Sequence, residues 1–156
     1  MDEQETSRSG GAATHETVHA PQVEAFILTD DGVFPNNRTL PLLRYKKALN
    51  LDLPDLVAQV QAVFAENHWV GAWVDGIFAY HHYHSTAHEV LAVCRGQADV
   101  CFGGEHGITL ALSAGDVVVI PAGVAHKNLG AGEDLVVVGA YPQGQEHYDL
   151  CQGQRE

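Results

Sequence analysis

The chain has 156 residues, a length that suits one domain with a buried core. Its 20 acidic and 8 basic side chains give a formal net charge of −12, which disfavours nucleic acid and membrane surfaces as partners. The sequence shows no apolar run of about 18 residues and no basic-then-apolar leader, and its three cysteines lack a C-x-x-C spacing. We therefore expect a cytoplasmic protein without a disulfide scaffold.

The N-terminal region divides into a tail and an arm. Residues 1–20 are polar, small and acidic, with little to bury, and they predict a disordered tail. We expect a single domain over residues 21–156, in which an arm and a helix (21–68) precede a barrel (69–150).

Two stretches of the arm, residues 23–28 and 40–45, are typical of extended chain, and Pro41 favours an edge position in a sheet. The arm could pair with the barrel or with a neighbouring subunit. We expect a homodimer formed through such an edge.

Residues 54–67 carry the pattern of the one helix that the sequence predicts. Apolar residues recur there at helical spacing, at Leu56, Val57, Val60, Val63 and Phe64. A helix with one such stripe packs on a sheet.

From Trp69 onward, short valine-rich segments alternate with Gly, Pro and Asp at intervals typical of a sandwich or barrel. Residues 91–94 and 97–102 predict a hairpin around a turn at Gly96. In that pairing Glu89 is the one charged side chain on an otherwise apolar inward face. A buried carboxylate is costly unless it is paired or binds a metal, so the pattern favours Glu89 as a metal ligand.

Two histidines near Glu89 complete the pattern of a metal site. His82 and His84 alternate, so on extended chain both side chains leave from one face. His126 follows a buried strand and a Pro-x-Gly turn, which fixes its position, and it is the natural fourth ligand. Three imidazoles and a carboxylate predict one divalent transition metal: iron, manganese, nickel, copper or zinc.

Three further residues are candidates for roles beside the metal. His81 and His88 flank ligands but fall on the opposite face, so contacts behind the ligands or at the surface suit them better than ligation. Tyr80 shares the inward parity of the ligands. It could hydrogen-bond a substrate or belong to the core. No acid or base for catalysis is assigned.

The motifs around these residues resemble those of the cupin superfamily. The first, G-x5-H-x-H-x3,4-E-x6-G, is filled by Gly76, His82, His84, Glu89 and Gly96. The second, G-x5-P-x-G-x2-H-x3-N, is filled by Gly115, Pro121, Gly123 and His126. Its last position departs from the pattern, because Asn128 comes two residues after the histidine instead of four.

The chain is more specifically similar to the small bacterial YjlB-type cupins over about residues 23–149. The resemblance lies in residues 26–28, 35–37, 81–91 and 138–142. It implies a mainly β, RmlC-like jelly-roll barrel (a double-stranded β-helix) that binds a metal, and it implies little about a reaction. We expect either a metal-dependent enzyme, dioxygenase- or isomerase-like, on a small molecule, or a non-catalytic module that binds a sugar or organic acid.

Overall fold

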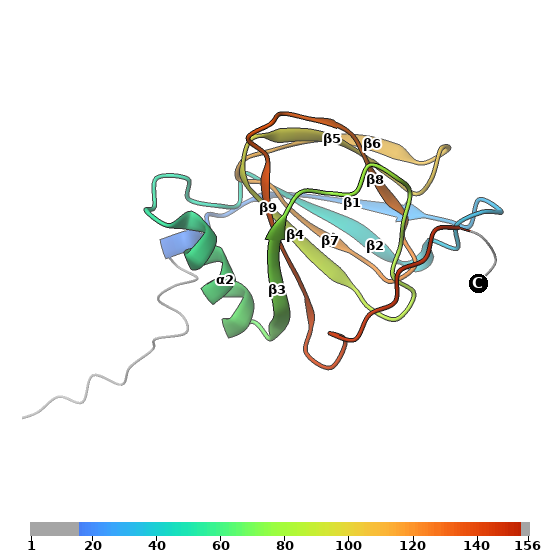
Figure 1. Cartoon of the computed structure of the whole chain (residues 1–156), viewed down its shortest axis with the longest axis horizontal. Helices are drawn as coiled ribbons and strands as arrows, with labels where there is room; N and C mark the ends of the chain where they lie inside the picture. The colour runs from blue at the N-terminus through green and yellow to red at the C-terminus, as the bar shows by residue number, and fades with distance from the viewer. Residues whose placement is uncertain (1–15, 154–156) are drawn as a thin grey trace, which may run out of the picture.

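Two antiparallel sheets face each other in the computed structural model, which describes residues 16–153 (Figure 1). The larger sheet has the strand order β1-β2-β7-β4-β9-β3 and the smaller one the order β6-β5-β8. The strands are β1 (Gln22–Leu28), β2 (Asn37–Lys46), β3 (Trp69–Asp75), β4 (Glu89–Arg95), β5 (Gln97–Phe102), β6 (Ile108–Ser113), β7 (Val117–Ile120), β8 (His126–Ala131) and β9 (Val136–Pro142). This arrangement confirms the predicted mainly β jelly roll.

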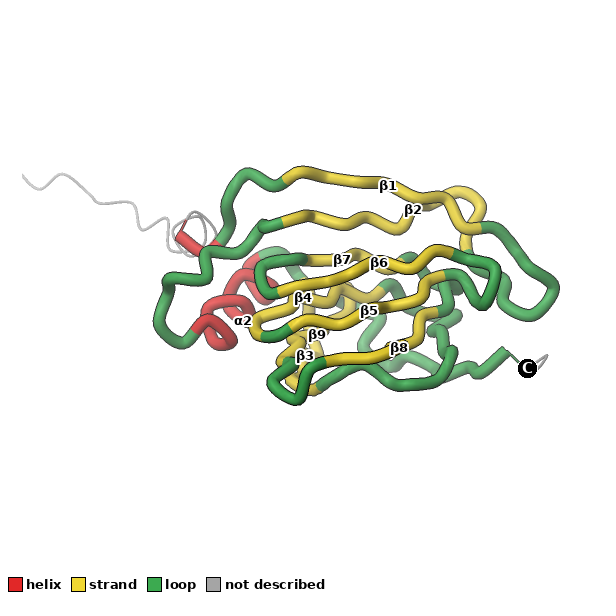
Figure 2. Tube along the Cα trace, turned by 90° about the horizontal axis from the view of Figure 1, so that it is seen from above, coloured by secondary structure: helices red, strands yellow, loops and turns green. Residues whose placement is uncertain are grey.

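The space between the two sheets holds the main core. Leu91 and Val93 of β4 meet Val100 and Phe102 of β5 there, and all four are at most 1% exposed. Figure 2 shows the smaller sheet lying over the β7, β4 and β9 part of the larger one, with β1 and β2 to one side. Side chains from both layers therefore fill one apolar interior.

Helix α2 (Leu56–Glu66), within the range that the sequence predicts, packs on the part of the larger sheet's outer face formed by β3, β4 and β9. Val60 and Phe64 of the helix pack with Val90 and Ala92 of β4. Because β4 is buried on both faces, its sequence is a continuous apolar run instead of an alternating one.

The predicted hairpin of residues 91–94 and 97–102 is wrong. β4 pairs with β7 and β9, whereas β5 pairs with β6 and β8, so the chain crosses between sheets at Gly96. Gly96 has a φ of 78°, and a Cβ there would lie 2.9 Å from the Cα of Leu135, so only glycine fits this crossing. The predicted inward face is nonetheless right, since alternation along each strand does not depend on its partner.

The arm pairs with the barrel of its own chain. β1 pairs with β2, and β2 pairs with β7 over Leu43 to Tyr45, so β2 is an interior strand instead of the expected edge. Pro41 cannot donate a hydrogen bond to a neighbouring strand, but it is tolerated here because it lies outside the stretch paired with β7 and beside an irregularity in the pairing with β1.

The predicted tail, residues 1–20, lies outside the described residues except for residues 16–20. These residues are attached to the segment before the helix, because the amide of His19 donates to the carbonyl of Ala48 and that of Asn50 to the carbonyl of Thr17. No helix within residues 16–153 is long and apolar enough to cross a membrane.

Candidate metal centre

His82 and His84 lie in the segment that joins β3 to β4, outside any regular strand. The segment is extended all the same, because neighbours on both sides hold it by backbone hydrogen bonds. His82 and His126 exchange two such bonds, of 3.1 and 2.9 Å, and Tyr83 and Cys151 exchange two more, of 2.9 Å each. The alternation read from the sequence therefore holds, and both imidazoles leave from the same side.

His126 opens β8, directly after the turn that the sequence singles out. Gly123 in that turn has a φ of 92°, and a Cβ there would collide with the carbonyl oxygen of Asn36. The Asn36 side chain in turn accepts a hydrogen bond from the amide of Ala125 at 3.1 Å. A packed turn thus fixes the histidine, which is 1% exposed.

The three histidines converge, and one ring nitrogen of each lies within 4.8 Å of the others. Their Nδ1 atoms each face a backbone carbonyl: Tyr80 for His82 at 3.1 Å, Val124 for His126 at 3.2 Å, and Asp149 for His84. A carbonyl only accepts hydrogen bonds, so each Nδ1 carries the proton. The Nε2 lone pairs are thereby left free for a metal, in the tautomer that ligating histidines need.

Glu89 completes the cluster from the first residue of β4. Its carboxylate is 3.2 Å from the Nε2 of His126 and 3.6 Å from the Nε2 of His84, and the residue is 3% exposed. Burial would raise the pKa of this carboxyl, but its interaction with the two imidazoles, first His126 and then His84, outweighs burial and holds the pKa far below its usual range. Glu89 is thus a buried negative charge.

The donor set fits a divalent cation. An unprotonated Nε2 and a carboxylate oxygen are both acceptors, so their close contact calls for a proton or a cation between them. Burial, followed by the charge of His126, lowers the pKa of His82 to about 3, which keeps that ring neutral and ready to ligate. Burial also disfavours protonation of His84, but the Glu89 carboxylate 3.6 Å away prevails and raises the pKa of His84. A bound cation would take the place of the proton that Glu89 favours on His84, which leaves neutral imidazoles and one carboxylate, a typical set for a transition metal.

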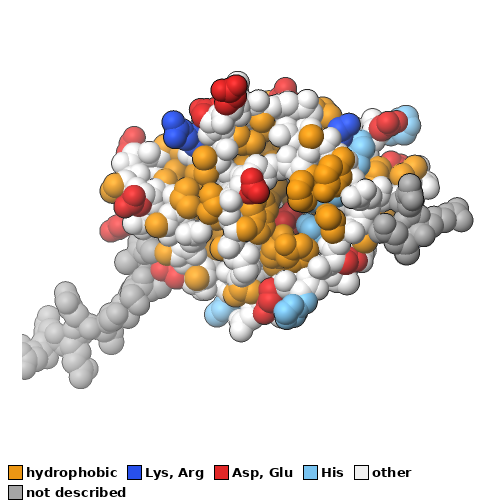
Figure 3. Space-filling model, viewed as in Figure 1, with side chains coloured by type: hydrophobic (Ala, Val, Ile, Leu, Met, Phe, Trp, Pro, Cys, Tyr) orange, Lys and Arg blue, Asp and Glu red, His pale blue; other side chains and the backbone are white. Residues whose placement is uncertain are grey.

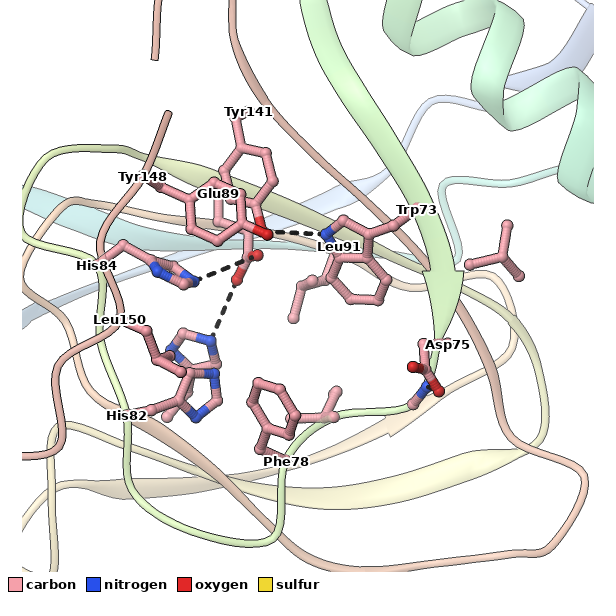
Figure 4. Close-up of a pocket in the computed structure, with 14 residues that line it drawn as sticks. Trp73, Asp75, Phe78, His82, His84, Glu89, Leu91, Tyr141, Tyr148 and Leu150 are labelled. Carbon is pink, nitrogen blue, oxygen red and sulfur yellow. Dashed lines mark hydrogen bonds and ion pairs between the residues drawn. The ribbon is translucent and has the colours of Figure 1, made fainter. Parts of the chain in front are cut away.

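The cluster lies at one side of a cavity of about 400 Å³. On the face of the molecule drawn in Figure 3, hydrophobic side chains surround a hollow in which histidine and acidic side chains are visible. Figure 4 shows Trp73 across the cavity from the histidines, with Tyr141 and Tyr148 at one end and Phe78 at the other. A small molecule that enters the cavity would therefore lie between aromatic walls and the metal-binding groups.

The three flanking candidates lie outside the converging cluster. Tyr80 contributes its carbonyl to His82, while its ring stacks on Phe78 with centroids 4.9 Å apart. His81 packs near Phe34 at 5.3 Å, and the Nδ1 of His88 accepts from the amide of Ala122 at 2.8 Å. His88 thus supports the turn that carries His126.

The sequence reading missed the C-terminal segment after β9. The Asp149 carboxylate accepts a hydrogen bond from the Ser85 amide at 2.7 Å and contacts the hydroxyls of Ser85 and Thr86. Burial would raise the pKa of Asp149, but the bonds from Ser85 outweigh it and lower that pKa to about 2. This segment also brings Tyr148 and Leu150 to the cavity, and no local pattern in the sequence indicates that placement.

Comparisons with known proteins agree with the fold. The model of the cupin domain matches residues 71–139. The uncharacterized protein YjlB of Bacillus subtilis (strain 168) is 39% identical over 132 residues, which cover 85% of this chain and 76% of that protein.

Two solved structures are more distantly similar. The acireductone dioxygenase of Bacillus anthracis, with a cadmium ion in its active centre, is 20% identical with a TM-score of 0.44, over 62% of this chain and 69% of that one. The dTDP-4-dehydrorhamnose 3,5-epimerase of Elizabethkingia anophelis is 11% identical with a TM-score of 0.46, over 80% of this chain and 75% of that one. Likenesses this distant leave the reaction open.

Proposed function

Because this chain belongs to the YjlB-like family of cupins, we propose that it binds one divalent transition metal on its three converging histidines and Glu89 and acts with it on a small molecule. The observation that carries the proposal is the fixed tautomer of the three rings, whose Nδ1 atoms are all held by carbonyls. Such an arrangement aims three unprotonated nitrogens at one point beside a buried carboxylate.

The proposed ligand set leaves room for chemistry. Three neutral imidazoles and one carboxylate on a divalent ion leave a single net positive charge, and four protein ligands leave two positions of an octahedron open. Iron, manganese, nickel, copper and zinc all suit these donors. When bound, the ion would act as a Lewis acid or an oxygen-activating centre for a ligand with two oxygen donors.

Tyr141 would contribute a proton donor beside the ligand. Its hydroxyl accepts a hydrogen bond from the indole of Trp73 at 3.1 Å, so its own proton is available to Glu89 or to a ligand oxygen. Burial and then the charge of Glu89 raise the pKa of Tyr141 well above its usual range, which keeps the hydroxyl protonated. A neutral donor of this kind suits a dioxygenase- or isomerase-like reaction, in which charge develops on oxygen.

A non-catalytic module that holds a small ligand, such as a sugar or an organic acid, on the metal is the second candidate. The cavity wall favours this candidate. Among residues 16–153, no lysine lines the cavity, and its only histidines are the three of the proposed metal site. The other carboxylate of the wall, Asp75, is exposed and lies across the cavity from the histidines, so the described residues place no general base directly beside the cluster (Figure 4).

The cytoplasm remains the proposed location, and the free thiols of Cys94 and Cys101 suit its reducing conditions.

The test is the metal content of protein purified without chelators, measured by mass spectrometry for the wild type, His82→Ala and His126→Ala. We expect near-stoichiometric metal in the wild type and loss in both variants, with His106→Ala, an exposed loop histidine, as the matched control. Metal that is absent from the wild type, or unchanged in the variants, would contradict the proposed ligands.

The enzyme and the binding module are then separated with the iron-loaded protein. Oxygen uptake and product formation would be followed against diketones, thiols and hydroxy acids. Turnover that disappears in His82→Ala identifies an enzyme, whereas tight binding without turnover identifies the module.

A further inference from the structure

We infer that the ligand of this site has a flat aromatic body and a chelating oxygen head with no more than one negative charge. The inference rests on the proposed metal and names the class of molecule that the cavity takes. It is carried by two observations: the rings that line the cavity and the distribution of charge around it.

Aromatic rings provide much of the cavity wall. Tyr141 and Tyr148 are stacked, with centroids 4.1 Å apart and planes 22° from parallel. Phe78 stands edge-on to His82 with centroids 5.1 Å apart, and Trp73 faces the cluster across the cavity (Figure 4). Phe78 is 51% exposed, so about half of this aromatic residue is uncovered beside the site.

These rings favour a particular shape of ligand. Aromatic side chains bind planar apolar groups by stacking and edge-on contact, each of which adds to the burial of apolar surface. A volume of about 400 Å³ lies within the range of small-molecule sites and suits a ligand of one or two rings. The aliphatic side chains of Ile77, Leu91 and Leu150 line the rest of the wall. An apolar body would thus meet apolar groups on most sides.

The charges exclude strongly anionic ligands. Within the part of the chain that the structure describes, no Lys or Arg lines the cavity, while Asp75 and Glu89 both do. Phosphates and dicarboxylates bind where cationic side chains pair with each charge. Here the metal centre would supply a single positive charge, which a monoanionic chelating head neutralises, and Asp75 would repel a second negative charge on the body.

Hydroxamates test this inference because they share one monoanionic chelating head and differ in the body. Binding of acetohydroxamate, benzohydroxamate and 4-carboxybenzohydroxamate to the zinc-loaded protein would be measured by calorimetry, with zinc content checked before and after. We expect benzohydroxamate to bind at least about tenfold more tightly than acetohydroxamate. The carboxylated probe should bind several-fold more weakly than benzohydroxamate. In Asp75→Asn, the difference in Kd between these two probes should become smaller.

Phe78→Ala should remove about half or more of the preference for the phenyl group and leave the zinc content unchanged. Leu129→Ala, which removes a similarly exposed apolar side chain from β8, is the control and should leave the preference intact. A zinc-loaded protein that binds the three probes alike, or prefers the carboxylated one, would overturn the inference alone. A protein that retains no zinc would overturn the proposed metal site and this inference with it.

Discussion

Replacing Glu89 with Gln removes the one carboxylate of the proposed ligand set and keeps the size of the side chain. The Glu89 Oε1 lies 3.2 Å from the Nε2 of His126, in a site where the carboxylate is 3% exposed. At that separation, with an effective dielectric constant of about 20, the attraction between the carboxylate and one unit of positive charge is about 5 kcal/mol. The amide oxygen and water recover part of this energy.

We therefore expect Glu89→Gln to weaken zinc binding by about 3 kcal/mol, or roughly two orders of magnitude in Kd. Competition with a chromophoric chelator at constant pH measures the change directly. His81→Ala is the first control, because His81 neighbours the cluster in sequence but packs near Phe34. Glu105→Gln, an exposed carboxylate, controls for net charge.

Equal zinc affinities in Glu89→Gln and His81→Ala would refute this reasoning, since they would mean that the inward carboxylate does not contact the ion. Melting curves add an independent readout. Zinc at 100 times its Kd stabilises a folded protein by about 2.7 kcal/mol, so the zinc-dependent rise in Tm should shrink in Glu89→Gln and persist in both controls.

Three other predictions concern the supports of the site and the assembly. Asp149→Ala should weaken zinc binding about tenfold, because it releases the segment whose carbonyl holds His84, and an unchanged Kd would show that this support is dispensable. Both Gly123 and Gly144 have positive φ, but a Cβ at Gly123 would collide with the carbonyl oxygen of Asn36, whereas one at Gly144 would meet no atom within 4 Å. In chemical denaturation, Gly144→Ala should therefore lower the free energy of unfolding by roughly 1 kcal/mol and Gly123→Ala by well over that amount. Light scattering should give the mass of two chains, and Ile27→Asp on the outermost strand β1 should give one chain; a wild-type mass of one chain would exclude a stable dimer.

The converging histidines could be predicted from the sequence because their placement depends on local rules. Alternation along extended chain puts His82 and His84 on one side even without a regular strand. A stiff proline and a glycine with positive φ fix the turn before His126. The buried position of Glu89 followed from the apolar pattern around it.

The features that the sequence did not predict depend on distant contacts. Gly96 has the local chemistry of a hairpin turn, yet the chain crosses to the other sheet there, since β4 pairs with β7 and β9 while β5 pairs with β6 and β8. β8 was missed because most of its residues are exposed or half-buried and show no strand pattern. The contact of Asp149 with Ser85 joins residues 64 positions apart, and no local pattern indicates it.

The most direct test of the metal centre is an anomalous difference map from crystals of the wild-type protein grown with zinc. We expect one strong peak among the Nε2 atoms of His82, His84 and His126 and the carboxylate of Glu89, with Zn–N distances of about 2.0–2.1 Å. No peak at the cluster, or an ion bound through an Nδ1 atom after a ring has left its backbone carbonyl, would contradict it.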